Sequence, residues 1–174
     1  AKNGHKGGGV IVVGDDPWND STQVPQDSRR LSDHLLIPSM EPATFQEVKD
    51  FIPLAFELSR RSDLYVSVIV STNLADGGSV VQVGPHPGSD SQRLGLQTLD
   101  SSAIPTRQTV LLPPHTGRLE RDAYERKFPL ALQAARDLGL NKVEVGAARL
   151  GFVAAGLPYA YLREMLADAG LEGR

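Results

Sequence analysis

The chain has no cysteine, and its 174 residues carry a net charge of only −3. Without cysteine it cannot form disulfides, offer a thiol nucleophile or ligate an iron–sulfur cluster by itself. No block of like charges is present, so we expect neither nucleic acid nor an anionic membrane as a partner. The apolar runs are far shorter than the roughly 18 residues of a membrane-spanning helix. These absences are typical of a cytoplasmic protein.

The motifs of several common enzyme classes are also missing. No G-x-S-x-G sequence is present, so a hydrolase built on a nucleophile elbow is not indicated. The four histidines lack the spacing of metal ligands. Gly7, Gly8 and Gly9 precede a predicted strand, whereas a phosphate-binding loop follows a strand and opens a helix. We therefore expect these glycines to bring the backbone close to a bulky neighbour or to turn it tightly into the sheet.

The residues that are present indicate an α/β fold, with a hydrophobic content of 40% that allows a packed core. Strands are predicted at residues 9–13, 37–40 and 64–72, and helices after Asp27 and after Thr44. The first strand is a continuous apolar run, as in a strand buried on both faces. Asp27 is expected to cap the first helix. Thr44 and Glu47 have the spacing of a capping box, and Pro53 predicts a kink.

Alternating strands and helices with short connections predict a parallel sheet covered by helices. In such sheets ligands bind outside the carboxyl ends of the strands. Two polar loops follow strands here, "GDDPWNDSTQ" at 14–23 and "STNLADGG" at 71–78, where the chain is expected to turn. The first of these loops is therefore the predicted site of chemistry.

The second half of the chain has a different organisation. Residues 84–108 are rich in glycine, proline and serine, which predicts a connecting segment over the surface, and "TVLLPP" after them predicts an extended stretch. A helix is predicted at 119–140, restarted or kinked by Pro129 and stopped by Gly139. A strand at 149–156 and a helix at 157–170 then predict the start of a second Rossmann-like sheet. The chain lacks an initial methionine and stops just after a predicted helix, so we expect a segment of a longer polypeptide or a processed chain.

Four residues of the first loop and its helix carry alternative interpretations. The pair Asp15–Asp16 could bind a metal ion, or one carboxylate could cap the turn while the other is solvated. Trp18 could wall an apolar pocket or pack the loop onto the domain. Arg29 could bind a carboxylate bidentately, or pair on the surface with Asp27 or Asp33.

Taken together, the first loop and the stretch "IPSMEPATFQEVKDFIPLAFELSR" resemble the 2-oxoacid:ferredoxin oxidoreductases, and among them the indolepyruvate ferredoxin oxidoreductases. The match covers residues 1–82 well and the later part more weakly. The residues that carry it are Gly14, Asp15, Asp16, Pro17, Ser21, Gln23, Asp27, Ser28, Arg29, Pro38, Glu41, Pro42, Gln46 and Glu47.

The resemblance implies an oligomeric enzyme that decarboxylates arylpyruvates on thiamine diphosphate with Mg²⁺. It passes electrons through iron–sulfur clusters to ferredoxin and forms an acyl-CoA from coenzyme A. Residues 1–82 would be the second half of a thiamine-diphosphate pyrimidine-type domain, and 83–108 a linker. Residues 109–174 would be a helical connection and the start of a transketolase C-terminal-like domain.

The resemblance also implies site residues. Arg29 would hold the substrate carboxylate, and Trp18 would line the entrance with Thr22 and Gln23. Asp16, Thr22 and Gln23 would contact the cofactor. The family's activating glutamate, its Gly-Asp-Gly loop for the diphosphate and Mg²⁺, and its cluster cysteines have no counterpart here. We therefore expect this chain alone to bind no cofactor and to be inactive without the remaining domains or subunits.

A second interpretation is a stand-alone regulatory module of the flavodoxin-like or receiver type, using the loop of Asp15 and Asp16. Ser71 and Thr72 would supply the hydroxyl groups that such a module needs. No predicted strand ends in the lysine that a receiver also requires.

Overall fold

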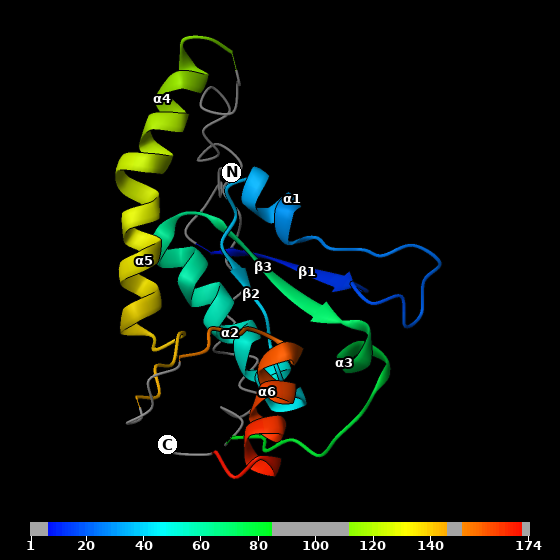
Figure 1. The fold of residues 1–174 in the computed structure, drawn as a ribbon. Helices are drawn as coiled ribbons and strands as arrows, with labels where there is room; N and C mark the ends of the chain where they lie inside the picture. Colours follow the sequence, from blue (N-terminus) through cyan, green and yellow to red (C-terminus); the bar gives the residue numbers. More distant parts are fainter. Residues whose placement is uncertain (1–6, 85–111, 146–150, 172–174) are drawn as a thin grey trace, which may run out of the picture.

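The computed structural model describes residues 7–84, 112–145 and 151–171. Its sheet is parallel, with the strand order β1-β3-β2, as Figure 1 shows. The strands are β1 (Gly9–Asp15), β2 (Ser39–Met40) and β3 (Tyr65–Ser71). The helices are α1 (Arg29–His34), α2 (Phe45–Ser62), α3 (Thr72–Asp76), α4 (His115–Asp122), the π-helical turn η3 (Ala123–Lys127), α5 (Phe128–Asp137) and α6 (Leu157–Asp168). The predicted parallel α/β arrangement is confirmed.

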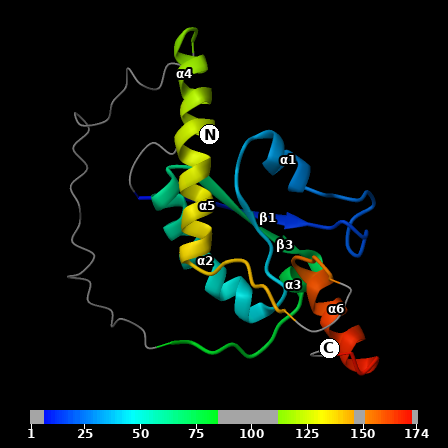
Figure 2. The ribbon, with the colours of Figure 1, turned by 60° about the vertical axis from the view of Figure 1, so that its left-hand side comes forward.

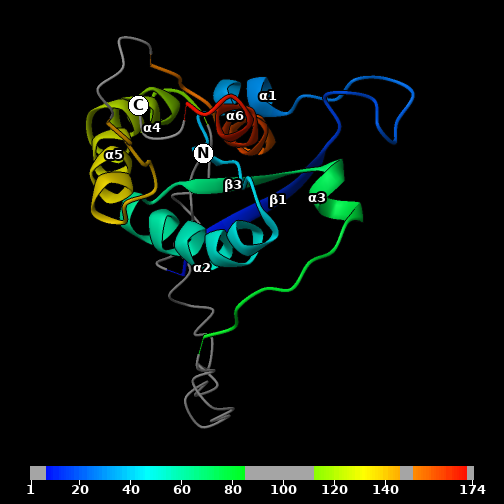
Figure 3. The same ribbon diagram turned by 60° about the horizontal axis from the view of Figure 1, so that its bottom comes forward.

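The core lies between the central strand β3 and helix α2. Val66, Val68 and Val70 alternate along β3 and pack against Ala55 and Leu58 of α2, all of them buried. β-Branched side chains suit this position because they pack well on a pleated surface. Helix α2 covers one face of the sheet, while α1 and α6 lie on the other face (Figure 3).

The prediction that the first strand is buried on both faces is wrong. In β1, Ile11 is 41% and Val12 62% exposed. β1 is an edge of the sheet, since no strand of the described residues pairs with its outer side. An apolar run indicates that both faces of a strand tend to be buried. It does not indicate which other segments cover those faces.

Two of the three glycines before β1 allow a close approach, as predicted. Gly8 has a φ of +82°, and a Cβ there would lie 2.9 Å from the carbonyl oxygen of Phe56. A Cβ on Gly9 would lie 2.5 Å from the ring of Tyr65, its partner across the ladder. Because Gly9 lacks a side chain, the Tyr65 ring can lie across the start of β1.

Helix α2 begins with the predicted capping box. The Thr44 hydroxyl accepts the Glu47 N–H at 3.2 Å, and the Glu47 carboxylate accepts the N–H of Ala43 at 2.8 Å. The helix then continues through Pro53 to Ser62. Both side chains therefore cap the helix. The Glu47 carboxylate accepts the N–H of the residue before the N-cap, whereas in the usual capping box it accepts the N–H of the N-cap itself.

The start of α1 differs by one residue from the prediction. Ser28, and not Asp27, is the N-cap. The Asp27 carboxylate still accepts the N–H of Arg29, at 3.1 Å. The Ser28 hydroxyl is directed to Asp15 instead of the helix. The N-cap position is therefore one residue later than predicted, while Asp27 still supplies the side chain that bonds to the first helical N–H.

Helices α4 and α5 join into one rod beside α2 (Figure 2). The predicted effect of Pro129 is confirmed as the π-helical turn η3, in which the Phe128 N–H bonds to the carbonyl of Ala123. Proline has no N–H to continue the α-helical pattern, so the backbone widens just before it. Gly139, at a φ of +62°, ends α5 as expected.

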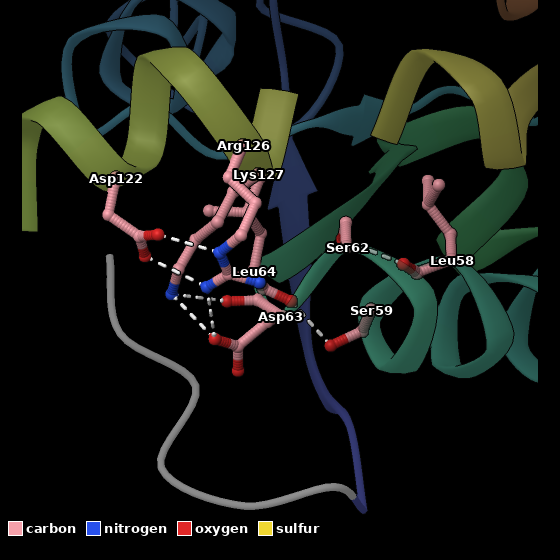
Figure 4. A network of polar contacts seen from close by, with 8 residues as sticks. All are labelled: Leu58, Ser59, Ser62, Asp63, Leu64, Asp122, Arg126 and Lys127. Carbon is pink, nitrogen blue, oxygen red and sulfur yellow. Dashed lines mark hydrogen bonds and ion pairs between the residues drawn. The ribbon is translucent and has the colours of Figure 1, made fainter. Parts of the chain in front are cut away.

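A buried lysine ties this rod to the end of α2, as Figure 4 shows. Lys127 is 4% exposed, and its Nζ lies 2.9 Å from both the backbone oxygen and Oδ2 of Asp63. Arg126 bonds to Asp122 at 2.6 Å and reaches Asp63 at 3.4 Å. Asp63 is the left-handed C-cap of α2, so one residue both ends a helix and anchors its neighbour.

The second half of the chain departs from the prediction in two places. Residues 151–155, which were predicted to lie in a strand, form no strand, although α6 follows them as expected. Leu74 lies in helix α3, where only a turn is expected. Residues 85–111 and 146–150 lie outside the described part, so the linker, the extended stretch and the domain boundaries stay predictions. None of the described helices combines the length and hydropathy needed to cross a bilayer.

Candidate functional site

A cleft of about 170 Å³ opens at the carboxyl edge of the sheet. All three strands reach it, and the start of α1 and the start of α6 close it. Its lining residues are Asp15, Pro17, Trp18, Arg29, Glu41, Pro42, Ile69, Ser71, Gly156, Leu157 and Pro158. This is the edge at which ligands bind in parallel sheets, and we call it the rim cleft.

A second cleft of about 150 Å³ lies on the opposite face of the same edge. Ile69 and Ser71 line the rim cleft, whereas Val70 and Thr72 line the second one, because successive side chains of a strand point to opposite faces. Asp15 borders both. The second cleft is lined by Gly14, Asp15, Asp16, Ser21, Thr22, Gln26, Val70, Thr72, Ala75 and Asp76.

Asp16 is the centre of the loop after β1. Its carboxylate accepts the N–H groups of Asp20, Ser21 and Thr22 and the Thr22 hydroxyl, at 2.7–2.9 Å. Burial alone would raise the pKa of Asp16, but the hydrogen bonds from Ser21, Thr22 and Asp20 outweigh it and lower the pKa to about 2. The carboxylate is therefore kept charged, and it fixes the loop.

Asp15 bonds to a different part of the chain from Asp16. Its carboxylate accepts the N–H and the hydroxyl of Ser28, at 2.8 and 3.0 Å, which joins the end of β1 to the start of α1. Asp15 is only 5% exposed and Asp16 only 3%, so the expectation of one solvated carboxylate is wrong. No group of three possible metal-ligating side chains occurs in the described residues, and no lysine lines either cleft.

Arg29 lies in the rim cleft between two carboxylates. Its Nε and Nη2 each donate to Asp27 at 2.8 Å, and its Nη1 lies 3.9 Å from Glu41. The Arg29 hydrogen bonds lower the pKa of Asp27. Burial raises the pKa of Glu41, against the opposing effect of Arg29. Arg29 is thus paired with Asp27, as the surface interpretation expected, and it also lines the cleft.

Trp18 connects the loop to the far end of the chain. Its ring centroid lies 6.0 Å from that of Tyr161 in α6, and its side chain lines the rim cleft. Trp18 therefore packs the loop against a helix, as the second interpretation expects, and it also lines a cleft whose walls are partly charged.

The predicted site residues fall into three groups. Arg29 and Trp18 line the rim cleft. Asp16 and Thr22 line the second cleft. Gln23 is exposed and lines neither. Their assigned roles remain predictions.

Several residues that line the rim cleft are not among the predicted substrate or cofactor residues, although Glu41 belongs to the family motif and Ser71 to the regulatory alternative. Glu41 directly follows β2, so the strand-end rule could have identified it. The Ser71 hydroxyl is buried there without a hydrogen-bond partner among the described residues. Gly156 had no sequence signal: its φ is +60°, and a Cβ there would lie 3.3 Å from the Glu41 side chain.

Comparison with known proteins gives one consistent result. No family model matches the chain, and no solved structure matches it. The indolepyruvate oxidoreductase subunit IorA of Archaeoglobus fulgidus is 31% identical over 97% of this chain and 26% of its own length. The subunits of the same name from Thermococcus kodakarensis and Methanothermobacter thermautotrophicus are 29% and 30% identical. The chain spans about a quarter of the length of these relatives. The family resemblance seen in the motifs is confirmed: nearly the whole chain is similar to one part of indolepyruvate oxidoreductase subunit IorA.

Proposed function

We propose that this chain is part of an enzyme that oxidatively decarboxylates arylpyruvates, such as indolepyruvate, on thiamine diphosphate. The enzyme would pass the electrons to ferredoxin through iron–sulfur clusters and release an acyl-CoA. The names of the relatives support an oxidoreductase of indolepyruvate with more than one subunit. The observation that carries the proposal is that Arg29 and Trp18 line one cleft at the carboxyl edge of the sheet.

The lining of the rim cleft combines a cationic group with apolar surface. Among the described residues, Arg29 is the only cationic one that lines the cleft, and a guanidinium is suited to bind a carboxylate through two N–H groups. Trp18, Ile69 and Leu157 provide apolar surface. A 2-oxoacid with an aromatic side chain also has one charged and one apolar end. We therefore assign the substrate carboxylate to Arg29 and the aromatic group to the Trp18 side.

The cofactors fit this chain only in part. Iron–sulfur clusters need ligands from elsewhere in the enzyme, because the chain has no cysteine. The carboxylates of Asp15 and Asp16 are occupied by their own loop, so they do not fit a Mg²⁺–diphosphate site. We propose that Asp16 and Thr22 affect the cofactor by fixing the shape of the second cleft, and that the diphosphate is bound by other domains.

Substituting Arg29 tests the proposal in the complete enzyme that contains this segment. Arg29→Ala should raise the KM for an arylpyruvate at least about tenfold, because hydrogen bonds to charged groups contribute about 1.5–3 kcal/mol. Steady-state kinetics at saturating ferredoxin and coenzyme A would measure this.

The matched control is Arg30→Ala, which removes an exposed arginine that lines neither cleft. Its KM should stay within about twofold of the parent enzyme, as is usual for surface substitutions. Equal KM values for the two variants would exclude Arg29 as the carboxylate ligand.

A further inference from the structure

Arg29 is held by one of its two carboxylate neighbours and only approached by the other. Asp27 accepts two hydrogen bonds of 2.8 Å from Nε and Nη2. Glu41 lies on the other side, with 3.9 Å between its Oε2 and Nη1 of Arg29, which is too long for a hydrogen bond. The contact of Arg29 with Asp27 is therefore a hydrogen-bonded ion pair, whereas its contact with Glu41 is an ion pair without a hydrogen bond.

Because Asp27 and Glu41 contact Arg29 differently, one edge of its guanidinium group has no hydrogen-bonded carboxylate. The group is a planar fork with five N–H donors, and two of its edges can each bind a carboxylate with parallel bonds. Asp27 occupies the edge formed by Nε and Nη2. The edge that includes Nη1 is directed toward Glu41, whose side chain is 22% exposed and lines the rim cleft.

We propose that Asp27 is the fixed partner that positions Arg29, and that Glu41 stands where the carboxylate of an incoming ligand binds and displaces it. This inference rests on the proposed function, since it assigns the carboxylate of the 2-oxoacid to the free edge of Arg29. Asp27 is a positioning residue, because it acts through Arg29. Glu41 acts on the ligand, because it competes for the same edge of Arg29 and repels a second carboxylate.

The charges around Glu41 predict in which direction ligand binding changes when Glu41 or Asp27 is substituted. Arg29 and Asp27 face Glu41 from the start of α1, and Asp15 faces it from the end of β1. Helix α6 contacts it through Gly156, which carries no charge. A ligand carboxylate is attracted by Arg29 and repelled by the ionised Glu41. Removing the charge of Glu41 should therefore strengthen binding. Substituting Asp27 also removes a nearby negative charge, but it should weaken binding because Arg29 loses the paired acceptor that holds it in position.

The pH dependence follows from the same groups. Burial raises the pKa of Glu41 above its ordinary value, whereas the hydrogen bonds from Arg29 lower the pKa of Asp27. Glu41 therefore loses its charge at a higher pH than Asp27. Ligand binding should weaken as the pH rises through the pKa of Glu41. This dependence should disappear when Glu41 cannot ionise.

The test compares three variants in the complete enzyme, with KM and kcat for an arylpyruvate measured as a function of pH. Glu41→Gln should lower the KM about two- to fivefold and flatten its pH profile, and Asp27→Asn should raise the KM by a similar factor, the range expected for partly exposed ion pairs. Asp33→Asn, on the exposed side of α1, should change neither. Both site variants should keep kcat and the melting temperature close to the parent values.

The outcomes separate this inference from the proposed function. A raised or unchanged KM in Glu41→Gln overturns the inference, and so does an unchanged KM in Asp27→Asn. In either case, a raised KM in Arg29→Ala still supports the proposed function. An unchanged KM in Arg29→Ala overturns the carboxylate role itself. A fall in melting temperature that accompanies every change in KM would show a purely structural role and would also overturn the inference.

Discussion

Two adjacent aspartates at the end of β1 show how residue chemistry depends on position. Asp15 binds the start of α1 through Ser28, and Asp16 holds the loop that follows the strand. Adjacent side chains on an extended backbone point in opposite directions, so the two carboxylates are directed to different partners. Their joint use at one metal ion, which the sequence alone allows, is not what their hydrogen bonds indicate.

The low pKa of Asp16 leads to a prediction about acid. A carboxylate with a pKa of about 2 in the folded loop and 3.8 ordinarily stabilises the loop above pH 3.8 and loses that effect as the pH falls through about 2. The fluorescence of Trp18, the only tryptophan, should report a transition in this window. Asp16→Asn should remove it, because the loop is already released at neutral pH.

Asp20→Asn is the control for this experiment. The Asp20 side chain is exposed, and only its backbone N–H bonds to Asp16. This variant should keep the acid transition of the parent protein. A transition that persists unchanged in Asp16→Asn would contradict the assignment.

At the scale of elements, local signals determined where α2 begins but not where α1 begins. Both side chains of the α2 capping box satisfy backbone N–H groups at the helix start, and such caps depend only on neighbouring residues. At α1 the Ser28 hydroxyl is drawn to Asp15, a residue of another element. A tertiary contact therefore takes the Ser28 hydroxyl away from the helix, and the Asp27 carboxylate accepts the first helical N–H instead.

The capping box predicts a measurable loss of stability. Thr44→Ala should lower the free energy of unfolding by about 1 kcal/mol, because an N-cap hydroxyl bond is lost. Thr116→Ala, at an exposed position of α4, should change it by less than about 0.5 kcal/mol. Urea denaturation monitored by circular dichroism would measure both, and equal losses would contradict a capping role for Thr44.

At the scale of the whole molecule, the sheet has one well-covered strand and one open edge. β3 is buried between helices, whereas β1 exposes Ile11 and Val12 at the edge of the described sheet. Exposed apolar edge strands tend to pair with other chains, because their N–H and C=O groups are free. The relatives are nearly four times as long as this chain, which is consistent with further elements that cover β1.

The open edge predicts self-association of the isolated chain. Val12→Lys should reduce its association in sedimentation experiments, because a charge on an edge strand opposes pairing. Val80→Lys adds the same charge at a position that is 98% exposed and outside any strand. It should leave the association almost unchanged. Equal effects of the two substitutions would indicate that net charge, and not the edge, controls association.

The sequence by itself determined the parallel sheet with its main helices and the edge of the sheet at which the candidate site lies. The apolar period of strands and helices, the capping box and the break at Pro129 are local, so residues close in the chain suffice to predict them. Only the tertiary structure decided that the start of α6 closes the rim cleft, that Tyr161 contacts Trp18, and that Glu41 faces Arg29. These contacts join distant segments, and no local periodicity encodes which segments pack together.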